Sequence, residues 1–202
     1  GGVPCPPFSK AGKQLGSKDE RDLFPVALRL VDEIRPSAVM LENVRGFLDP
    51  IFEEYRLGLK RRFEQMGYAV GWRLLNASDY GVSQLRPRVV IVALRNNLSE
   101  VMSWPPPART PPMTVGELLQ DQMALNGWIG AAHWARQADN IAPTVVGGSK
   151  KHGGADLGPT RAKKAWAALG VDGKGVADAP PERNFVGMPR LTTRMVARIQ
   201  GF

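Results

Sequence analysis

The sequence predicts an α/β fold of the doubly wound type, in which helices pack on a mostly parallel sheet. In the first 97 residues, apolar residues at helical spacing alternate with short apolar runs of strand length. A proline-rich stretch at 104–112 then separates this part from a region of different composition. Alternating helices and strands are typical of α/β domains, so we expect one such domain followed by a smaller second one.

Two helices are predicted in the first part. Residues 21–35 carry apolar side chains at helical spacing, with Pro25 in the first turn and Pro36 after the last. Residues 51–66 repeat the pattern, and Gly67 follows as a stop signal.

Three strands are predicted beside these helices. The continuous apolar run 38–41 is typical of a strand buried on both faces of a parallel sheet, and 68–75 and 88–94 are further strands. The first run ends on Glu42 and Asn43. In open α/β sheets, ligands and catalytic groups collect at the carboxyl edge of the strands, so these two residues are candidates for a site.

The second half of the chain has a different texture. It is rich in glycine and basic residues as far as about Pro181, which indicates a small domain with long loops. Residues 191–199 then show helical spacing again. We expect an α/β domain over 1–97, a linker and second domain over 98–183, and a helix returning to the first domain within 184–202.

Composition excludes several classes of protein. The chain has 202 residues, 43% of them hydrophobic, which is too many for a disordered chain. No apolar run approaches the roughly 18 residues of a membrane span. A single cysteine excludes an internal disulfide framework and a thiolate-rich zinc site, and no metal is predicted. The net charge of +8 favours a polyanionic partner only modestly.

Cys5 is the first candidate for chemistry. A lone cysteine is usually an inert part of a core. Here prolines lie on both sides of it and a polar, basic segment follows at 9–22, which are poor core surroundings. A thiolate nucleophile needs nearby positive charge and partial exposure, which this segment could supply.

Glu42 and a basic cluster are the other candidates. A carboxylate at a strand end is more often solvated or a cap. One loop, one helix and one strand separate it from Cys5, however, and that βαβ content brings both to the same sheet edge. Alternation puts Gln84, Arg86 and Arg88 on one face, either as an exposed basic surface or as a clamp for a carboxylate, phosphate or base.

Four segments, in order and at matching spacing, resemble the cytosine-C5 DNA methyltransferases. They are 1–9 with 12–14 for the catalytic loop, 42–44 for the ENV motif, 75–88 for the segment ending in Q-x-R-x-R, and 190–202 for the motif that packs the target-recognition domain. The resemblance implies part of a doubly wound, Rossmann-like methyltransferase sheet with a small, loop-rich target-recognition domain.

The resemblance also assigns roles. Cys5 would attack C6 of cytosine, so that C5 can accept the methyl group of S-adenosylmethionine, and Glu42 would hold a proton at N3. Arg86 and Arg88 would hold the base, and Asn43 would brace the catalytic loop. None of this chemistry is possible within stacked duplex DNA, so the target base must flip out.

Further residues are implied in binding. Pro4 and Leu23 would contact the cofactor. The implied contacts to double-stranded DNA are Ser9, Lys10, Ala11, Lys13, Arg21, Gln84, Lys150, Lys151, Arg161, Lys163 and Lys164. The alternative is that the basic residues form a solvated surface that binds no partner.

The sequence departs from the family pattern in several places. Pro6 stands where glutamine is common, and Met195 where glutamate is common. The chain contains no glycine-rich strand–loop–helix turn, and the resemblance places the main S-adenosylmethionine motifs outside it. We therefore expect a fragment that is inactive alone and needs a missing N-terminal portion or a complementary chain.

Three readings of function remain open from the sequence. The first is a bacterial-type, cytoplasmic cytosine methyltransferase, either part of a restriction-modification system or an orphan enzyme. The second is a DNA-binding module without catalysis. The third is a basic α/β protein whose motifs are coincidental, which the ordered set of four motifs disfavours.

Overall fold

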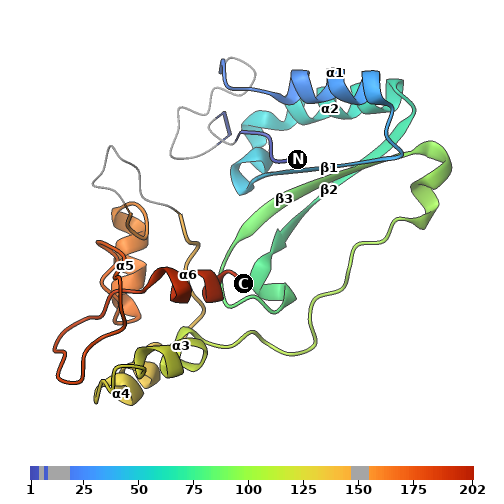
Figure 1. The fold of residues 1–202 in the computed structure, drawn as a ribbon. Helices are drawn as coiled ribbons and strands as arrows, with labels where there is room; N and C mark the ends of the chain where they lie inside the picture. Colours follow the sequence, from blue (N-terminus) through green and yellow to red (C-terminus); the bar gives the residue numbers. More distant parts are fainter. Residues whose placement is uncertain (5–6, 9–18, 147–154) are drawn as a thin grey trace. The chain divides into compact units, whose positions relative to one another are not determined.

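The computed structural model describes residues 1–4, 7–8, 19–146 and 155–202 (Figure 1). The chain divides into two compact units. Unit 1 comprises residues 1–75 and 87–106, and unit 2 comprises residues 76–86 and 107–202. Within the described residues, no helix has both the length and the apolar character that crossing a bilayer requires.

Unit 1 is built from a three-stranded sheet and two helices, as the sequence predicts. The strands are β1 (Ala38–Val44), β2 (Tyr68–Asn76) and β3 (Pro87–Arg95), in the spatial order β1-β3-β2. The helices are α1 (Phe24–Ile34) and α2 (Glu53–Gln65), which lie side by side (Figure 1). The α/β class is confirmed.

The pairing of β1 differs from the prediction. It is antiparallel to β3, with Leu41 opposite Ile91, and its Glu42 also forms an isolated parallel bridge with Gly2. Leu41 is buried in the core with α1 and α2, whereas Met40, on the other face, is 65% exposed. The expectation of a parallel strand buried on both faces was therefore wrong for 38–41, because an uninterrupted apolar run does not reveal which faces are covered.

Unit 2 is a small helical unit with long connections. Its helices are α3 (Val115–Met123), α4 (Ala131–Gln137), α5 (Thr160–Ala168) and α6 (Thr193–Ile199). Only α6 was predicted. The others are seven to nine residues long and fall where the sequence predicted long loops. Short 3₁₀ helices complete the two units at Arg45–Leu48, Pro50–Phe52, Ala77–Tyr80 and Asn96–Val101.

Helix α6 packs within unit 2. Met195 and Ile199 are buried in the same core as Leu119 and Met123 of α3. Thr192 caps the helix by accepting from the Met195 N–H at 3.2 Å, and the Met195 sulfur accepts from the Thr192 N–H at 3.4 Å. Methionine thus takes the place of the glutamate of a capping box, with a weaker acceptor. The return of 184–202 to the first domain, and the predicted boundaries, stay predictions.

Candidate active site

The sheet of unit 1 brings Glu42 and Arg88 together. The antiparallel register sets Glu42 opposite Val90 and Val44 opposite Arg88. Arg88 therefore lies near enough for its Nε to form an ion pair with the Glu42 carboxylate. The Glu42 side chain is 44% exposed and that of Arg88 21% exposed, so the pair remains accessible to a ligand. Arg88 also donates from Nη1 to the carbonyl of Pro87 at 2.9 Å, which fixes the guanidinium.

The segment that leads to Cys5 runs beside Glu42. Gly2 pairs with Glu42 as a parallel bridge, and the Glu42 N–H donates to the Gly1 carbonyl at 3.0 Å. A Cβ on Gly2 would lie 3.5 Å from Glu42 Oε2, so this backbone passes directly along the carboxylate. Cys5 itself lies outside the described residues. Gly2, three residues before the predicted nucleophile Cys5, therefore lies beside the predicted acid Glu42.

Asn43 is a buried polar residue next to this pair. It is 1% exposed, and its Oδ1 accepts from the Val44 N–H at 2.8 Å. Its Nδ2 is buried and has no hydrogen-bond partner among the described residues. A buried donor without a partner is costly, so this amide is available to bind a further group. Its predicted role in bracing the catalytic loop stays a prediction.

Gln84 and Arg86 belong to unit 2, whereas Arg88 belongs to unit 1. Because β3 begins at Pro87, strand alternation does not extend back to Gln84. Gln84 is 1% exposed, its Oε1 accepts from the Val145 N–H at 2.9 Å, and its backbone pairs with Ala142. The prediction of one shared face was wrong for Gln84, whose burial favours a role in holding segment 142–145. The predicted contacts of Gln84 and Arg86 stay predictions.

The predicted DNA contacts of unit 2 divide by their partners. Lys163 forms an ion pair with Asp156 at 2.5 Å, and that carboxylate is 6% exposed. Arg161 and Lys164 are exposed on the same helix, α5, and have no ion pair within the part of the chain that the structure describes. Lys150 and Lys151 lie outside the described residues.

The predicted contacts near the N-terminus are only partly described. Ser9, Lys10, Ala11 and Lys13 lie outside the described residues. Arg21 is described, and it binds Asp19 through Nε at 2.8 Å and Nη2 at 2.7 Å. These side-chain hydrogen bonds hold the pKa of Asp19 at about 2. The carboxylate therefore compensates the Arg21 charge at neutral pH.

The two residues predicted to contact the cofactor offer apolar surface. Leu23 precedes α1 and is 43% exposed, and Pro4 is half-buried. Both suit van der Waals contact with a ring and offer no side-chain hydrogen bond. Among the residues with described positions, no group of three His, Cys, Asp or Glu side chains could hold a metal ion.

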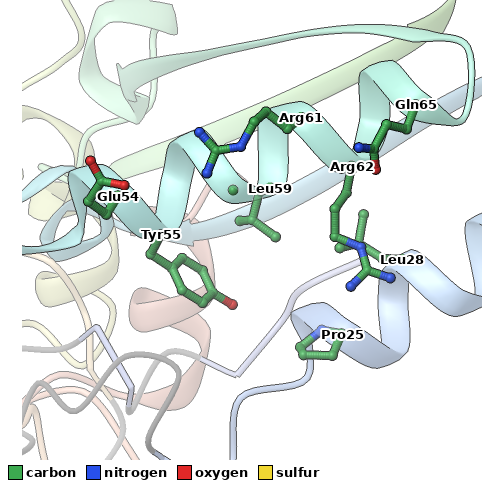
Figure 2. A pocket seen from close by; sticks show the side chains of 9 residues that line it. Pro25, Leu28, Glu54, Tyr55, Leu59, Arg61, Arg62 and Gln65 are labelled. Atoms are coloured by element: carbon green, nitrogen blue, oxygen red, sulfur yellow. The ribbon is translucent and has the colours of Figure 1, made fainter.

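A groove between α1 and α2 was not predicted from the sequence (Figure 2). Its volume is about 400 Å³. Pro25, Leu28 and Leu59 form an apolar floor, and Arg62 extends from α2 toward Leu28 and Pro25. The sequence signal was the glycine at position 58, which leaves room on the surface of α2.

Comparison with known proteins identifies the family. The profile of the family described as C-5 cytosine-specific DNA methylase matches residues 1–202. This chain belongs to that methylase family. The family predicted from the four motifs is therefore confirmed.

Individual methylases are similar over the whole chain. Type II methyltransferase M.NaeI from Lentzea aerocolonigenes is 62% identical over 204 residues, covering 100% of this chain and 49% of that protein. Type II methyltransferase M.NgoMIV from Neisseria gonorrhoeae is 54% identical over 205 residues, covering 100% of this chain and 65% of that protein. The chain thus spans from about half to two thirds of the length of these two methylases.

Likeness to solved structures is weaker. The crystal structure of S. pombe Dnmt2 methyltransferase matches with a TM-score of 0.48 and 16% identity, covering 100% of this chain and 64% of that one.

Proposed function

We propose that this chain supplies the nucleophile, the base-binding groups and the DNA-recognition part of an enzyme that methylates C5 of cytosine in duplex DNA. The observation that carries the proposal is the Glu42–Arg88 ion pair beside the segment leading to Cys5. A carboxyl and a guanidinium fixed together suit the edge of a pyrimidine that presents N3 and O2, and a cysteine three residues after Gly2 suits attack on the electrophilic C6.

The chemistry assigned to the chain begins with the thiolate of Cys5. Its electron pair forms a bond to C6, and the C5–C6 π electrons move into the ring, where a proton from Glu42 at N3 compensates the charge. C5 then becomes nucleophilic. S-adenosylmethionine, held in part by Pro4 and Leu23, would supply an electrophilic methyl group to C5, and its sulfonium would leave as a neutral thioether. Loss of the C5 proton to solvent would then expel the Cys5 thiolate, and return of the N3 proton to the Glu42 carboxylate would restore the aromatic ring.

Arg88 has a positioning role toward the base in this scheme. Two of its donors are occupied by Glu42 and by the Pro87 carbonyl, and the guanidinium has three more. These can donate to O2 of a flipped cytosine while Arg88 keeps the carboxyl of Glu42 in place. Arg86 would contact the DNA backbone.

The rest of the cofactor site is assigned to polypeptide beyond this chain. M.NaeI has about as much sequence again outside the matched region. An apolar stripe on unit 1 suits such a partner, since Leu23, Val26, Leu30 and Ile34 of one helix face are 40–69% exposed. The chain alone would then bind S-adenosylmethionine weakly and be inactive. Micromolar binding of the cofactor to the 202-residue chain in a calorimetric titration would contradict this assignment.

Covalent trapping tests the enzymatic proposal. The chain is combined with the remainder of the M.NaeI polypeptide, S-adenosylmethionine and a duplex containing 5-fluorocytosine, whose fluorine cannot be lost as a proton. We expect an adduct that survives denaturation, and Cys5→Ser should abolish it while leaving DNA binding. We place this methylation reaction on DNA in the bacterial cytoplasm.

The outcomes separate the enzyme from a DNA-binding module. An adduct with the parent chain and none with Cys5→Ser supports catalysis. DNA binding without any adduct, in a mixture that binds S-adenosylmethionine, would favour a module that only recognises DNA. An adduct that persists in Cys5→Ser would show that another residue is the nucleophile.

A further inference from the structure

We propose that Phe8, Asp22 and Tyr55 form a clamp that fixes the chain on both sides of segment 9–18. They would act as positioning residues for Cys5 and for the DNA contacts of that segment, without touching the base. The proposal rests on the methyltransferase function proposed above. Phe8 precedes the segment, Asp22 follows it, and Tyr55 comes from α2.

The Phe8 ring is the centre of an aromatic cluster. It is fully buried, although it lies only three residues after Cys5. Its ring centroid lies 5.1 to 5.7 Å from those of Phe24, Phe47, Phe52 and Tyr55, three of them in edge-to-face geometry. Such ring pairs add stability beyond the area that they bury and prefer definite orientations. The backbone after Cys5 is therefore held at a defined place in unit 1.

A hydrogen bond fixes the other side of the segment to the same cluster. The Tyr55 hydroxyl donates to Asp22 Oδ2 at 2.6 Å, and Asp22 Oδ1 accepts from the Phe24 N–H at 3.0 Å. Tyr55 projects from α2 on the side of α1 (Figure 2). Burial above all, and then the neighbouring Asp22, raise the pKa of Tyr55. The phenol thus stays protonated and remains a donor at neutral pH.

Through the side chain of Tyr55, the clamp joins the segment that carries the predicted nucleophile to the segment that carries a predicted cofactor contact. The Tyr55 ring packs against that of Phe8 in a tilted geometry, and its hydroxyl donates to Asp22. Cys5 lies just before Phe8, and Leu23, a predicted cofactor contact, lies directly after Asp22. A shift of one side relative to the other would move the nucleophile relative to the methyl donor. Misplacing reacting groups by about 1 Å can reduce a rate by about 100-fold.

A purely structural role is the alternative explanation, because buried rings also stabilise a core. Tyr68 offers a matched control. It is 1% exposed, and its hydroxyl donates to the Pro36 carbonyl at 2.6 Å. That hydrogen bond has the same length as the Tyr55 bond but does not involve residues next to segment 9–18.

The experiment compares Tyr55→Phe with Tyr68→Phe in the chain combined with the remainder of M.NaeI. Both substitutions keep the ring and remove one hydroxyl. We expect Tyr55→Phe to lower kcat about tenfold with KM for DNA changed less than about twofold, because positioning acts on the reacting geometry. Tyr68→Phe should leave both constants unchanged. The two variants should lower the midpoint of thermal unfolding similarly.

A second variant removes the ring cluster in part. Phe8→Leu keeps an apolar side chain of similar size but loses the edge-to-face contacts, and it should lower the rate of adduct formation with 5-fluorocytosine DNA while leaving DNA affinity. If Phe8→Leu does not fold, the comparison of the two tyrosine variants still decides.

The clamp would be overturned if Tyr55→Phe and Tyr68→Phe both kept the full kcat of the parent. An equal loss of kcat in both tyrosine variants, in step with their unfolding midpoints, would also overturn it in favour of a structural role. Failure of the methyltransferase proposal looks different, because the parent protein itself would then form no adduct.

Discussion

The two units of the chain build their cores in different ways. In unit 1, large apolar side chains follow the periodicity of long helices and strands, as in Leu28, Val31, Leu59 and Phe63. In unit 2, alanines and tryptophans join the large aliphatic residues of the core, including Ala131, Ala135, Ala138, Trp134 and Trp166. The first kind of core is visible as a sequence pattern. The second depends on close approach of backbones, which the pattern does not report.

The charged residues differ between the units as well. In unit 1, Glu42 of β1 forms an ion pair with Arg88 of β3, and Gly2, from the segment that leads to Cys5, lies beside Glu42. In unit 2, Lys163 of the predicted DNA surface pairs with Asp156, and a further cation of that unit, Arg190, pairs with Asp172. Sequence charge therefore overstates the number of cations that unit 2 can offer to phosphates.

The contrast between the cores predicts opposite effects for one substitution. At Gly116 in α3, an added Cβ would lie 1.9 Å from the carbonyl oxygen of Ala135 in α4. Gly116→Ala should therefore separate the helices and destabilise unit 2 by about 3 kcal/mol. Urea unfolding followed by tryptophan fluorescence measures this, since three of the five tryptophans, Trp128, Trp134 and Trp166, lie buried in unit 2.

Gly58→Ala is the matched change in unit 1. Gly58 lies inside α2, where an added Cβ would meet nothing within 4 Å. Alanine should stabilise this helix by about 0.5–1 kcal/mol, because glycine loses more backbone entropy on folding. Circular dichroism during urea unfolding follows it. Changes of the same sign in the free energy of unfolding for Gly116→Ala and Gly58→Ala would contradict this difference between the two units.

The contrast in charge predicts a loss of rate from unit 1. Glu42→Gln keeps a partner for Arg88 but removes the acid, and kcat should fall about 100-fold if the carboxyl supplies a proton to the base. Glu54→Gln, on α2, is the control and should leave kcat unchanged. DNA affinity, measured by fluorescence anisotropy, should be similar in both variants. A Glu42→Gln enzyme with full kcat would remove Glu42 from the chemistry.

The difference between the units also explains which elements could be predicted from the sequence. Helices α1 and α2 and the three strands of unit 1 were predictable, because long periodic segments have unambiguous faces. The placement of Glu42 at a sheet edge with Cys5 came from sheet topology, and the role of Arg88 in holding the base came from the motifs. The ion pair of Glu42 with Arg88 was not predicted, because it depends on the antiparallel register of β1 with β3, and a run such as 38–41 fits either pairing.

Unit 2 could not be predicted for identifiable reasons. Helix α3 begins at a capping box of Thr114 and Glu117, a signal that is present in the sequence but common elsewhere. Helix α4 packs through the contact of Gly116 with Ala135, which depends on two backbones at close range. The burial of Gln84 arises from a bridge to Ala142, far along the chain. The clamp at Tyr55 is likewise a long-range contact.

The pairing of cations predicts which residues of α5 bind DNA. Arg161→Ala and Lys164→Ala should each weaken DNA binding and reduce the slope of log affinity against log salt by about 1. Lys163→Ala should change that slope little and instead lower the stability of unit 2 by about 1 kcal/mol, because the half-buried ion pair with Asp156 is removed. Titrations at several salt concentrations distinguish them. Equal slopes for all three variants would contradict the division into paired and unpaired cations.

The smallest effects concern two ion pairs, one in each unit. Arg21 binds Asp19 two residues away, whereas Arg198 of α6 binds Asp121 of α3, 77 positions away, at 2.7 Å. Hydrogen bonds from the arginines lower the pKa of both carboxyls, that of Asp19 from 3.8 to about 2. A carboxyl with a lowered folded pKa stabilises the fold above its unfolded pKa, and this stabilisation is lost as the pH falls through the folded pKa.

The two pairs should nevertheless respond differently to acid. A pair between neighbours in sequence can persist in the denatured chain, and then it contributes little to the difference between states. The pair between α3 and α6 is lost on unfolding. Lowering the pH from about 6 to about 3 should therefore narrow the gap in unfolding midpoint between the parent and Arg198→Ala more than that between the parent and Arg21→Ala. Differential scanning fluorimetry at both pH values measures the two gaps, and a larger change for Arg21→Ala would show that the local pair forms only in the folded chain.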